Sequence, residues 1–237
     1  MNHLKIIRTF LVQKRNFEDL PEYGFPFVTL SQQAGAGGHF LSYAVLTEFL
    51  KYRDNSLFEG WHVFDRELCE VIAQDPELQS SMETLVSEKY RSEFDDFMDS
   101  LFTGQSSQYH LNKEAFRVVR MLALIGKVII VGRSASLITA DLPQGVHVRL
   151  VAPHAQRLAR MMKRFKLCRE KARETIDRQD SDRRKRVKRL FNRDIDDPLI
   201  YDAVWNTGKV GVDTICHSII DLINSRADKK RKLIQHV

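Results

Sequence analysis

The sequence predicts an α/β fold in which helices pack around a mainly parallel β-sheet. Short apolar segments of strand length alternate along the chain with longer segments that have the periodicity of amphipathic helices. This alternation is typical of parallel sheets, because a helix must return the chain before the next parallel strand begins. A glycine-rich stretch, Ser31 to His39, directly follows the first apolar segment.

Five segments are expected to form the strands of this sheet. They are residues 25–30, 62–64, 127–131, 145–151 and 201–205. Residues 127–131 have the continuous apolar pattern of a strand that is buried on both faces. Ligands of such sheets bind at the carboxyl ends of the strands. The glycine-rich loop, Gly132-Arg133 and Asn206-Thr207 all follow expected strands, so we expect them along one edge of the sheet.

The helices are expected between these strands and at both ends of the chain. They are residues 3–15, 40–52, a helix that starts near residue 66, 77–102, 112–125, 154–165, 167–190 and 211–225. Residues 1–24 are interpreted as an N-terminal helical extension that precedes the main fold. Residues 226–237 are interpreted as a charged tail that frays. Gly126 has the residue type and the position of a helix C-cap.

The composition is that of a globular protein with a hydrophobic core. Of the 237 residues, 43% are hydrophobic and 29% are charged. No apolar run approaches the roughly 18 residues of a membrane span, and the N-terminus lacks the apolar centre of a signal peptide. The three cysteines lie far apart and suggest neither a disulfide framework nor a zinc site. The histidines show no ligand spacing, so no metal site is predicted, and we expect a cytoplasmic protein with no membrane partner.

The net charge of +6 originates in one segment. Residues 157–193 contain 16 Lys and Arg against 5 Asp and Glu, whereas the rest of the chain contains 21 basic and 26 acidic residues. Such a segment can close over the phosphates of a nucleotide, bind a nucleic acid backbone or form a solvated helix face. Nucleic acid is the less favoured partner, because aromatic residues for base stacking occur only near the ends, at Phe165 and Phe191.

The glycine-rich loop, Ser31-Gln-Gln-Ala-Gly-Ala-Gly-Gly-His39, points most directly to function. Glycines let a backbone approach an anion closely, and a following helix presents free N–H groups to it. The lysine and the hydroxyl of the usual phosphate-binding motif are absent, because Gly38 and Phe40 stand at those positions. Residues 16–50 contain no Lys or Arg, so only His39 could give the loop positive charge. A structural turn without a ligand is the alternative interpretation.

Several motifs, taken in order, resemble the cytidylate kinase-like family, a branch of the P-loop nucleoside monophosphate kinases. They are the glycine-rich loop, Phe64-Asp-Arg-Glu-Leu68, Val131-Gly-Arg133, Val148-Arg-Leu-Val151, the helix with Arg157, Arg160 and Arg164, Asp180-Ser-Asp-Arg183, and Tyr201-Asp-Ala-Val-Trp-Asn-Thr207. The resemblance implies a three-layer P-loop NTPase fold with a five-stranded sheet over residues 25–225. It also implies an acceptor-binding insertion around 65–125 and a mobile lid around 165–195.

The resemblance further implies transfer of the γ-phosphoryl group of ATP to a nucleoside monophosphate such as CMP, with Mg²⁺ accompanying ATP. ATP and the monophosphate are the expected partners of a monomer or homodimer. Because the loop lacks a lysine, a nucleotide-binding regulatory protein with little or no turnover is the second hypothesis.

Three groups of site residues follow from the resemblance. Those expected to bind the phosphates of ATP are Gly35, Ala36, Gly37, Gly38, His39, Asn206 and Thr207. Those expected near the acceptor are Asp65, Arg66 and Arg133, and those expected to be catalytic are Arg178, Asp180 and Arg183. Asp180 is expected to orient an arginine or a metal-bound water. The alternatives are a helix cap for Asp65, an ion pair for Arg133 and an ordinary turn for Asn206-Thr207.

Overall fold

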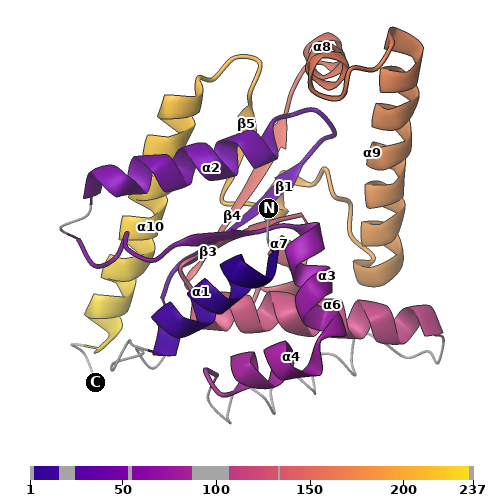
Figure 1. Cartoon of the computed structure of the whole chain (residues 1–237). Coiled ribbons are helices and arrows are strands. Elements are labelled where there is room, and N and C mark those ends of the chain that lie inside the picture. Colours follow the sequence, from indigo (N-terminus) through magenta and orange to yellow (C-terminus); the bar gives the residue numbers. More distant parts are fainter. Residues whose placement is uncertain (1–2, 16–24, 53–54, 87–106, 133, 235–237) are drawn as a thin grey trace.

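The computed structural model describes residues 3–15, 25–52, 55–86, 107–132 and 134–234 (Figure 1). Five strands form one sheet in the order β2-β3-β1-β4-β5, and all neighbouring strands run parallel. The strands are β1 Phe27–Gln32, β2 His62–Phe64, β3 Val128–Val131, β4 Gly145–Val151 and β5 Ala203–Asn206. The predicted α/β fold with a parallel five-stranded sheet is thus confirmed.

The predicted strands agree with the observed ones to within two residues. β1 starts after Pro26, which has no N–H for a ladder hydrogen bond, and continues through the polar residues Ser31 and Gln32. These two residues pair with Arg149 and Leu150 of the long strand β4. The partner strand therefore determines where β1 ends. The polarity of Ser31 and Gln32 had wrongly predicted an end at residue 30.

The helices also follow the expected order. They are α1 His3–Arg15, α2 Gly38–Phe49, α3 Arg66–Gln74, α4 Pro76–Glu83, α6 Ser107–Ile125, α7 Ala135–Ile138, α8 His154–Phe165, α9 Arg169–Phe191 and α10 Val212–Ile234, with 3-10 turns at Leu50–Tyr52 and Pro198–Ile200. The helix expected over 77–102 begins as α4, and residues 87–106 lie outside the described residues. α10 continues past its expected end at residue 225 into the segment that was expected to fray. α7 was not predicted, because four residues are too few to show helical periodicity.

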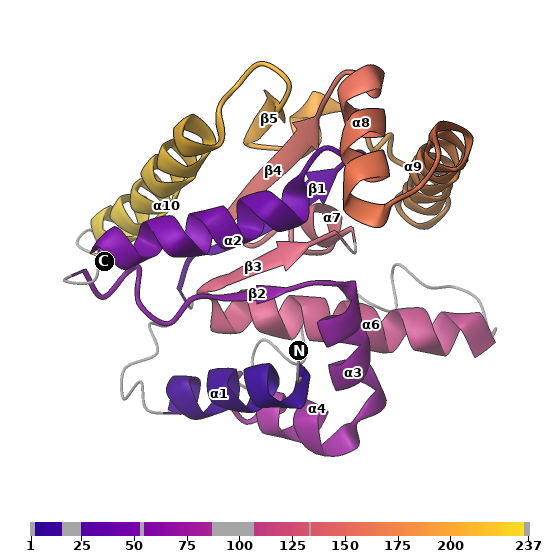
Figure 2. The same ribbon diagram turned by 45° about the horizontal axis from the view of Figure 1, so that its top comes forward.

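The sheet lies between two layers of helices (Figure 2). α2 and α10 cover one face and pack against Val28 and Ile129. α6, together with α1, α3 and α4, covers the other face and packs against Phe27 and Ile130. Adjacent residues of β1 and of β3 therefore point to opposite layers, as the two-residue period of a strand requires. In the described part of the chain, no helix is both long and apolar enough to cross a membrane.

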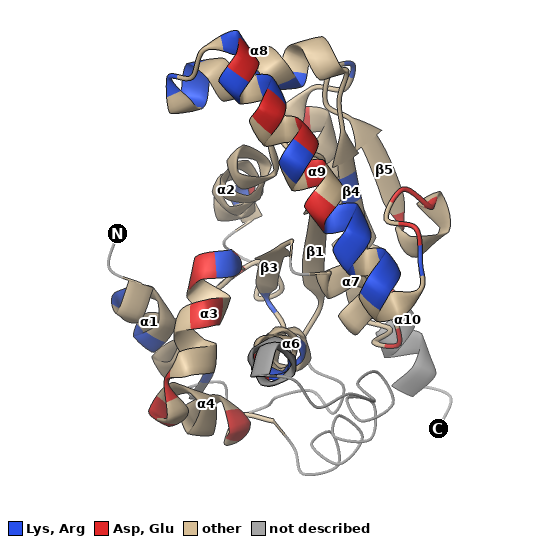
Figure 3. Ribbon diagram, turned by 90° about the vertical axis from the view of Figure 1, so that its right-hand side faces the viewer, with Lys and Arg blue, Asp and Glu red and all other residues tan. Residues whose placement is uncertain are grey.

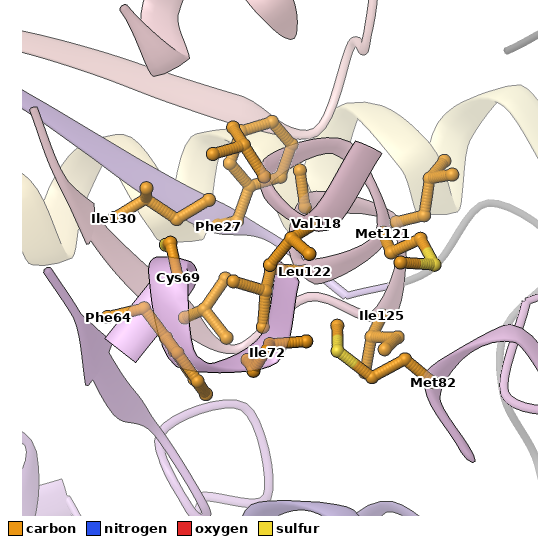
Figure 4. Close-up of a cluster of buried hydrophobic side chains, with 14 of the residues drawn as sticks. Phe27, Phe64, Cys69, Ile72, Met82, Val118, Met121, Leu122, Ile125 and Ile130 are labelled. Carbon is orange, nitrogen blue, oxygen red and sulfur yellow. The ribbon is translucent and has the colours of Figure 1, made fainter. Parts of the chain in front are cut away.

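The N-terminal helix α1 is part of the hydrophobic core. Ile7 and Phe10 are fully buried, and the ring of Phe10 packs edge-on against Phe64 of β2, with centroids 5.0 Å apart. The same cluster includes Ile72 of α3 and Leu122 of α6 (Figure 4). α1 is therefore one of the helices that cover this core on its face of the sheet.

Two buried lysines lie near the ring of Phe25. Lys14 Nζ is 5.7 Å and Lys127 Nζ is 4.2 Å from the ring centroid, and Lys127 donates to the backbone oxygen of Ser56 at 2.7 Å. Burial, helped by the charge of Lys127, lowers the pKa of Lys14 to about 7. Burial also lowers the pKa of Lys127 to about 8, although Glu59 opposes this. Holding charged ammonium groups in this region therefore costs stability.

We expect Lys14→Met to stabilise the fold at neutral pH. Between pH 7 and the ordinary lysine pKa of 10.5, the unfolded chain keeps a proton that folded Lys14 has released. The free energy of unfolding of the wild type therefore rises with pH in this window, and the variant lacks this part of the rise. At pH 7 the gain is on the order of 1–3 kcal/mol. Denaturant titrations at neutral and alkaline pH measure it, and a lower Tm of the variant at pH 7 would contradict it.

Candidate functional site

A cleft of about 1520 Å³ opens at the carboxyl ends of the strands. Its walls come from the glycine-rich loop, the start of α3, the turn after β3, α8 and one face of α9. This is the edge where ligands of parallel sheets bind. The predicted residues that line the cleft are Gly35, Ala36, Gly37, Gly38, His39, Asp65, Arg66, Arg183 and Thr207. Asn206, Arg178 and Asp180 do not line it, and Arg133 lies outside the described residues.

The conformation of the loop requires its glycines. Gly35 and Gly37 have φ angles of +79° and +97°, which residues with a Cβ rarely adopt. A Cβ on Gly35 would also lie 2.8 Å from the backbone oxygen of Arg157, so the loop packs directly on α8. Within the described residues, the backbone N–H groups of Gly35, Gly37 and His39 donate no hydrogen bond. These three groups are therefore available to an anion.

His39 does not supply the positive charge that the loop lacks. The pKa of its imidazole is lowered from 6.5, and burial is the largest cause. The charge of Asp65 opposes this shift, whereas the charge of Arg164 adds to it. His39 is therefore neutral at pH 7, and the loop from Gln32 to His39 carries no charge of its own.

We expect the fold to lose stability as the pH drops below about 6.5. Burial lowers the pKa of His62 and His147 as well as that of His39. Below pH 6.5 the histidines of the unfolded chain bind protons that those of the folded chain do not. The free energy of unfolding therefore decreases as the pH is lowered. His147→Asn is expected to flatten this dependence in urea titrations on both sides of pH 6.5, whereas the exposed control His154→Asn is not. An unchanged slope in His147→Asn would contradict this explanation.

Arginines of α8 supply positive charge beside the loop. Arg160 donates from Nη1 to the hydroxyl of Thr207 at 2.8 Å and from Nη2 to the backbone oxygen of Thr207 at 2.9 Å. Thr207 in turn donates from Oγ1 to the backbone oxygen of Ala36 at 2.9 Å. Arg164 lies one turn after Arg160, and both line the cleft together with Lys163. The spacing of Arg160 and Arg164 was visible in the sequence, but their position beside the loop was not.

Asp180 joins α9 to the loop and to α8. Its Oδ1 accepts hydrogen bonds from the backbone N–H of Ala34 at 2.7 Å and from Arg183 Nη1 at 3.1 Å. Its Oδ2 accepts from Nη1 of the buried Arg157 at 2.6 Å. Arg157 also donates to the backbone oxygens of Ala34 and Ala152. Both carboxylate oxygens are therefore used within the protein, so Asp180 orients two arginines and does not face the cleft.

One face of α9 is directed toward the cleft. Its lining residues recur at helical spacing and are Gln179, Asp182, Arg183, Arg186 and Val187. The C-terminal half of the helix, from Arg183 onward, is rich in Lys and Arg (Figure 3). Arg178 is exposed and does not line the cleft, and it lies about 140° around the helix from Arg183. The arginines that α9 brings to the cleft are thus Arg183 and Arg186, and the position of Arg178 does not support a catalytic role.

Residues 27–209 match the sequence pattern of the cytidylate kinase-like family. The chain belongs to this family. α1 lies before the matched region, and α10 lies after it. The predicted resemblance to the cytidylate kinase-like family is thus confirmed.

Among solved structures, an uncharacterized protein from Eubacterium ventriosum ATCC 27560 has the same fold. Its TM-score is 0.64 at 21% identity, over 84% of this chain and 98% of that chain. A shikimate kinase from Acinetobacter baumannii, in complex with shikimate, has a TM-score of 0.43 at 15% identity, over 86% of this chain and 95% of that chain. A search of curated proteins returned no match.

In this member of the cytidylate kinase-like family, Asp65 and Arg66 lie at the start of α3. Asp65 Oδ1 accepts from the backbone N–H groups of Glu67 and Leu68 at 3.0 and 3.1 Å, which confirms the helix cap. Arg66 Nε donates to Glu70 at 3.1 Å. Because both residues also line the cleft, a role near the acceptor remains a prediction.

Asn206 and Thr207 differ in what they contact. Asn206 Oδ1 accepts from the backbone N–H of Gly208 at 3.0 Å, as in an ordinary turn, and Asn206 does not line the cleft. Thr207 holds Arg160 beside the loop, as described above. Thr207 is therefore the member of the pair that can influence a ligand.

The cleft has carboxylates for a magnesium ion that arrives with ATP, although the position of the usual loop hydroxyl is taken by Phe40. Phe40, at the usual hydroxyl position, is exposed and has no ligand atom. Asp65, Glu67 and Asp182 line the cleft, and Mg²⁺ commonly takes one or two carboxylates plus phosphate and water oxygens. No group of three or more metal-binding side chains occurs among the residues that were described. These residues fit an ion held mainly by the nucleotide.

Proposed function

We propose that this protein transfers the γ-phosphoryl group of ATP to a nucleoside monophosphate, with a CMP-like acceptor. The observation that carries the proposal is that one cleft contains both the free N–H groups of the loop and the cations of α8 and α9. Phosphoryl transfer requires mainly positioning and neutralisation of phosphate charge. Membership of the cytidylate kinase-like family supports the same reaction class.

In this proposal, the N–H groups of Gly35, Gly37 and His39 bind the β-phosphate of ATP. An oxygen of the acceptor phosphate attacks the γ-phosphorus, the bond to the bridging oxygen breaks, and ADP leaves. Mg²⁺ that accompanies ATP supplies neutralisation of the β- and γ-phosphates. No separate catalytic base is needed, because the acceptor phosphate is already an anion.

The arginines divide between the donor and the transferring group. Arg160 and Arg164 lie on the wall beside the loop and bind the donor phosphates. Arg183 and Arg186 act on the transferring group from the face of α9. Asp65, Arg66 and Arg133 orient the acceptor at the start of α3 and after β3.

A nucleotide-binding regulatory protein with little turnover is the second candidate. The observation that favours it is the lack of charge on the loop, where a P-loop kinase uses a lysine. In this case ATP binds through the backbone and α8, but the transition state is poorly stabilised.

One pair of measurements separates the two candidates. ADP formation from ATP and Mg²⁺ is followed with CMP, UMP, AMP and GMP as acceptors, and ATP binding is measured by calorimetry on the same preparation. Acceptor-dependent ADP formation supports the kinase. ATP binding without turnover for any acceptor supports the regulatory protein and contradicts the kinase, whereas failure to bind ATP contradicts both.

A further inference from the structure

The side chain of Gln32 lies inside the glycine-rich loop. Gln32 is the last residue of β1, and its Oε1 accepts a hydrogen bond from the backbone N–H of Gly38 at 2.6 Å. Gly38 is the first residue of α2, and N–H groups at a helix N-terminus are those that normally receive an anion. A neutral amide oxygen therefore occupies the place in which Gly38 would bind a phosphate oxygen.

A side chain at position 38 would have to displace that of Gln32. A Cβ on Gly38 would lie 2.5 Å from Gln32 Oε1 and 2.6 Å from Leu30 Cδ2, closer than real Cβ atoms approach. Gly38, unlike Gly35 and Gly37, does not have a positive φ, so its backbone conformation alone would accept another residue. The space for a side chain at Gly38 is thus already filled from β1.

We propose that Gln32 is a built-in substitute for a phosphate group, which competes with the nucleotide for the N–H of Gly38. This inference rests on the proposed function. The free N–H groups of Gly35, Gly37 and His39 make the first contacts with the polyphosphate of the donor. Gln32 then rotates away, and the phosphate takes over the N–H of Gly38. Gln32 therefore sets the affinity of the loop for polyphosphate.

Calorimetric titration of the full chain with inorganic tripolyphosphate, and separately with ATP, tests the competition. Gln32→Ala removes the competitor and is expected to raise both affinities about 3- to 10-fold, the value of one hydrogen bond. Gln32→Glu places a carboxylate at the same site and is expected to lower them more than tenfold. Gln33→Ala is the matched control, because Gln33 Oε1 accepts instead from the backbone N–H of Ala152. A several-fold loss of affinity in Gln32→Ala would mean that Gln32 contacts the phosphate directly, and would overturn the proposal.

A thermal double-mutant cycle tests the placement of Gln32 without any ligand. Gly38→Ala is expected to lower Tm, because its methyl group would lie 2.5 Å from Gln32 Oε1 and 2.6 Å from Leu30 Cδ2. The same substitution is expected to cost less in the Gln32→Ala background, in which only the contact with Leu30 remains. Equal losses in the two backgrounds, with unchanged tripolyphosphate affinity, would overturn the role of Gln32 and leave the proposed function standing. Strong coupling in the cycle, with no polyphosphate binding by wild type or Gln32→Ala, would overturn the proposed function itself.

Discussion

Replacement of Asp180 by Asn is expected to lower the free energy of unfolding by about 3–5 kcal/mol. The carboxylate accepts three hydrogen bonds, from Ala34, Arg157 and Arg183. An Asn amide must turn its NH₂ group toward at least one of these donors. The substitution also leaves the buried guanidinium of Arg157 without its charged partner, which is the larger loss.

Asp177→Asn is the matched control for this prediction. Asp177 lies three residues earlier on α9, and its ion pairs with His154 and Arg173 are exposed and 3.9 Å long. Exposed pairs contribute roughly 0–1 kcal/mol, so this variant should unfold almost like the wild type. Urea denaturation of both variants makes the comparison, and equal losses would show that Asp180 does not link α9 to the loop.

Replacement of Arg183 by Ala is expected to lower kcat on the order of 10²–10³-fold, with the affinity for ATP largely kept. Arg183 lines the cleft from α9, and its guanidinium is oriented by Asp180 and Gln179. In the proposed reaction, Arg183 stabilises charge on the transferring phosphoryl group in the transition state. Loss of Arg183 is therefore expected to affect turnover more than ATP binding. Steady-state ADP formation and ATP calorimetry measure the two effects separately.

Arg178→Ala is the control on the same helix, since it also removes one positive charge. Arg178 is exposed and does not line the cleft. Its loss should leave kcat within about twofold of the wild type, because surface charges act only weakly through solvent. If Arg178→Ala were as slow as Arg183→Ala, the net charge of α9 would matter and the orientation of its arginines would not.

The elements that the sequence predicted well are those with a purely local cause. β3 is buried on both faces, so its continuous apolar run was sufficient, and β4 has an apolar residue at every second position from Val146 to Leu150. α8 has a sharp change of pattern at each end. Gly126 has a φ of +75° after α6, as expected of a C-cap. The glycine-rich loop and the carboxyl ends of the other strands lie at one edge of the sheet, because all neighbouring strands are parallel.

The features that were missed depend on which surfaces meet. The sequence showed that α8 and α9 are basic, but only the packing of α9 on the loop decides that Arg183 faces the cleft and Arg178 does not. Asp180 is close to Ala34 although 146 residues separate them. The side chain of Gln32 turns back into the loop because Gly38 leaves room for it, and no local pattern distinguishes this from an exposed glutamine.

The hydrophobic core extends beyond the part of the chain that matches the family, because α1 packs into it. The family match begins at residue 27, yet Ile7, Phe10 and Leu11 are buried in the same cluster as Phe64 and Leu122. A chain trimmed to the matched region would present that apolar surface to water, and exposed surfaces of this kind cause aggregation. We therefore expect that a stable piece of the chain must include the first helix, although this helix lies outside the family match.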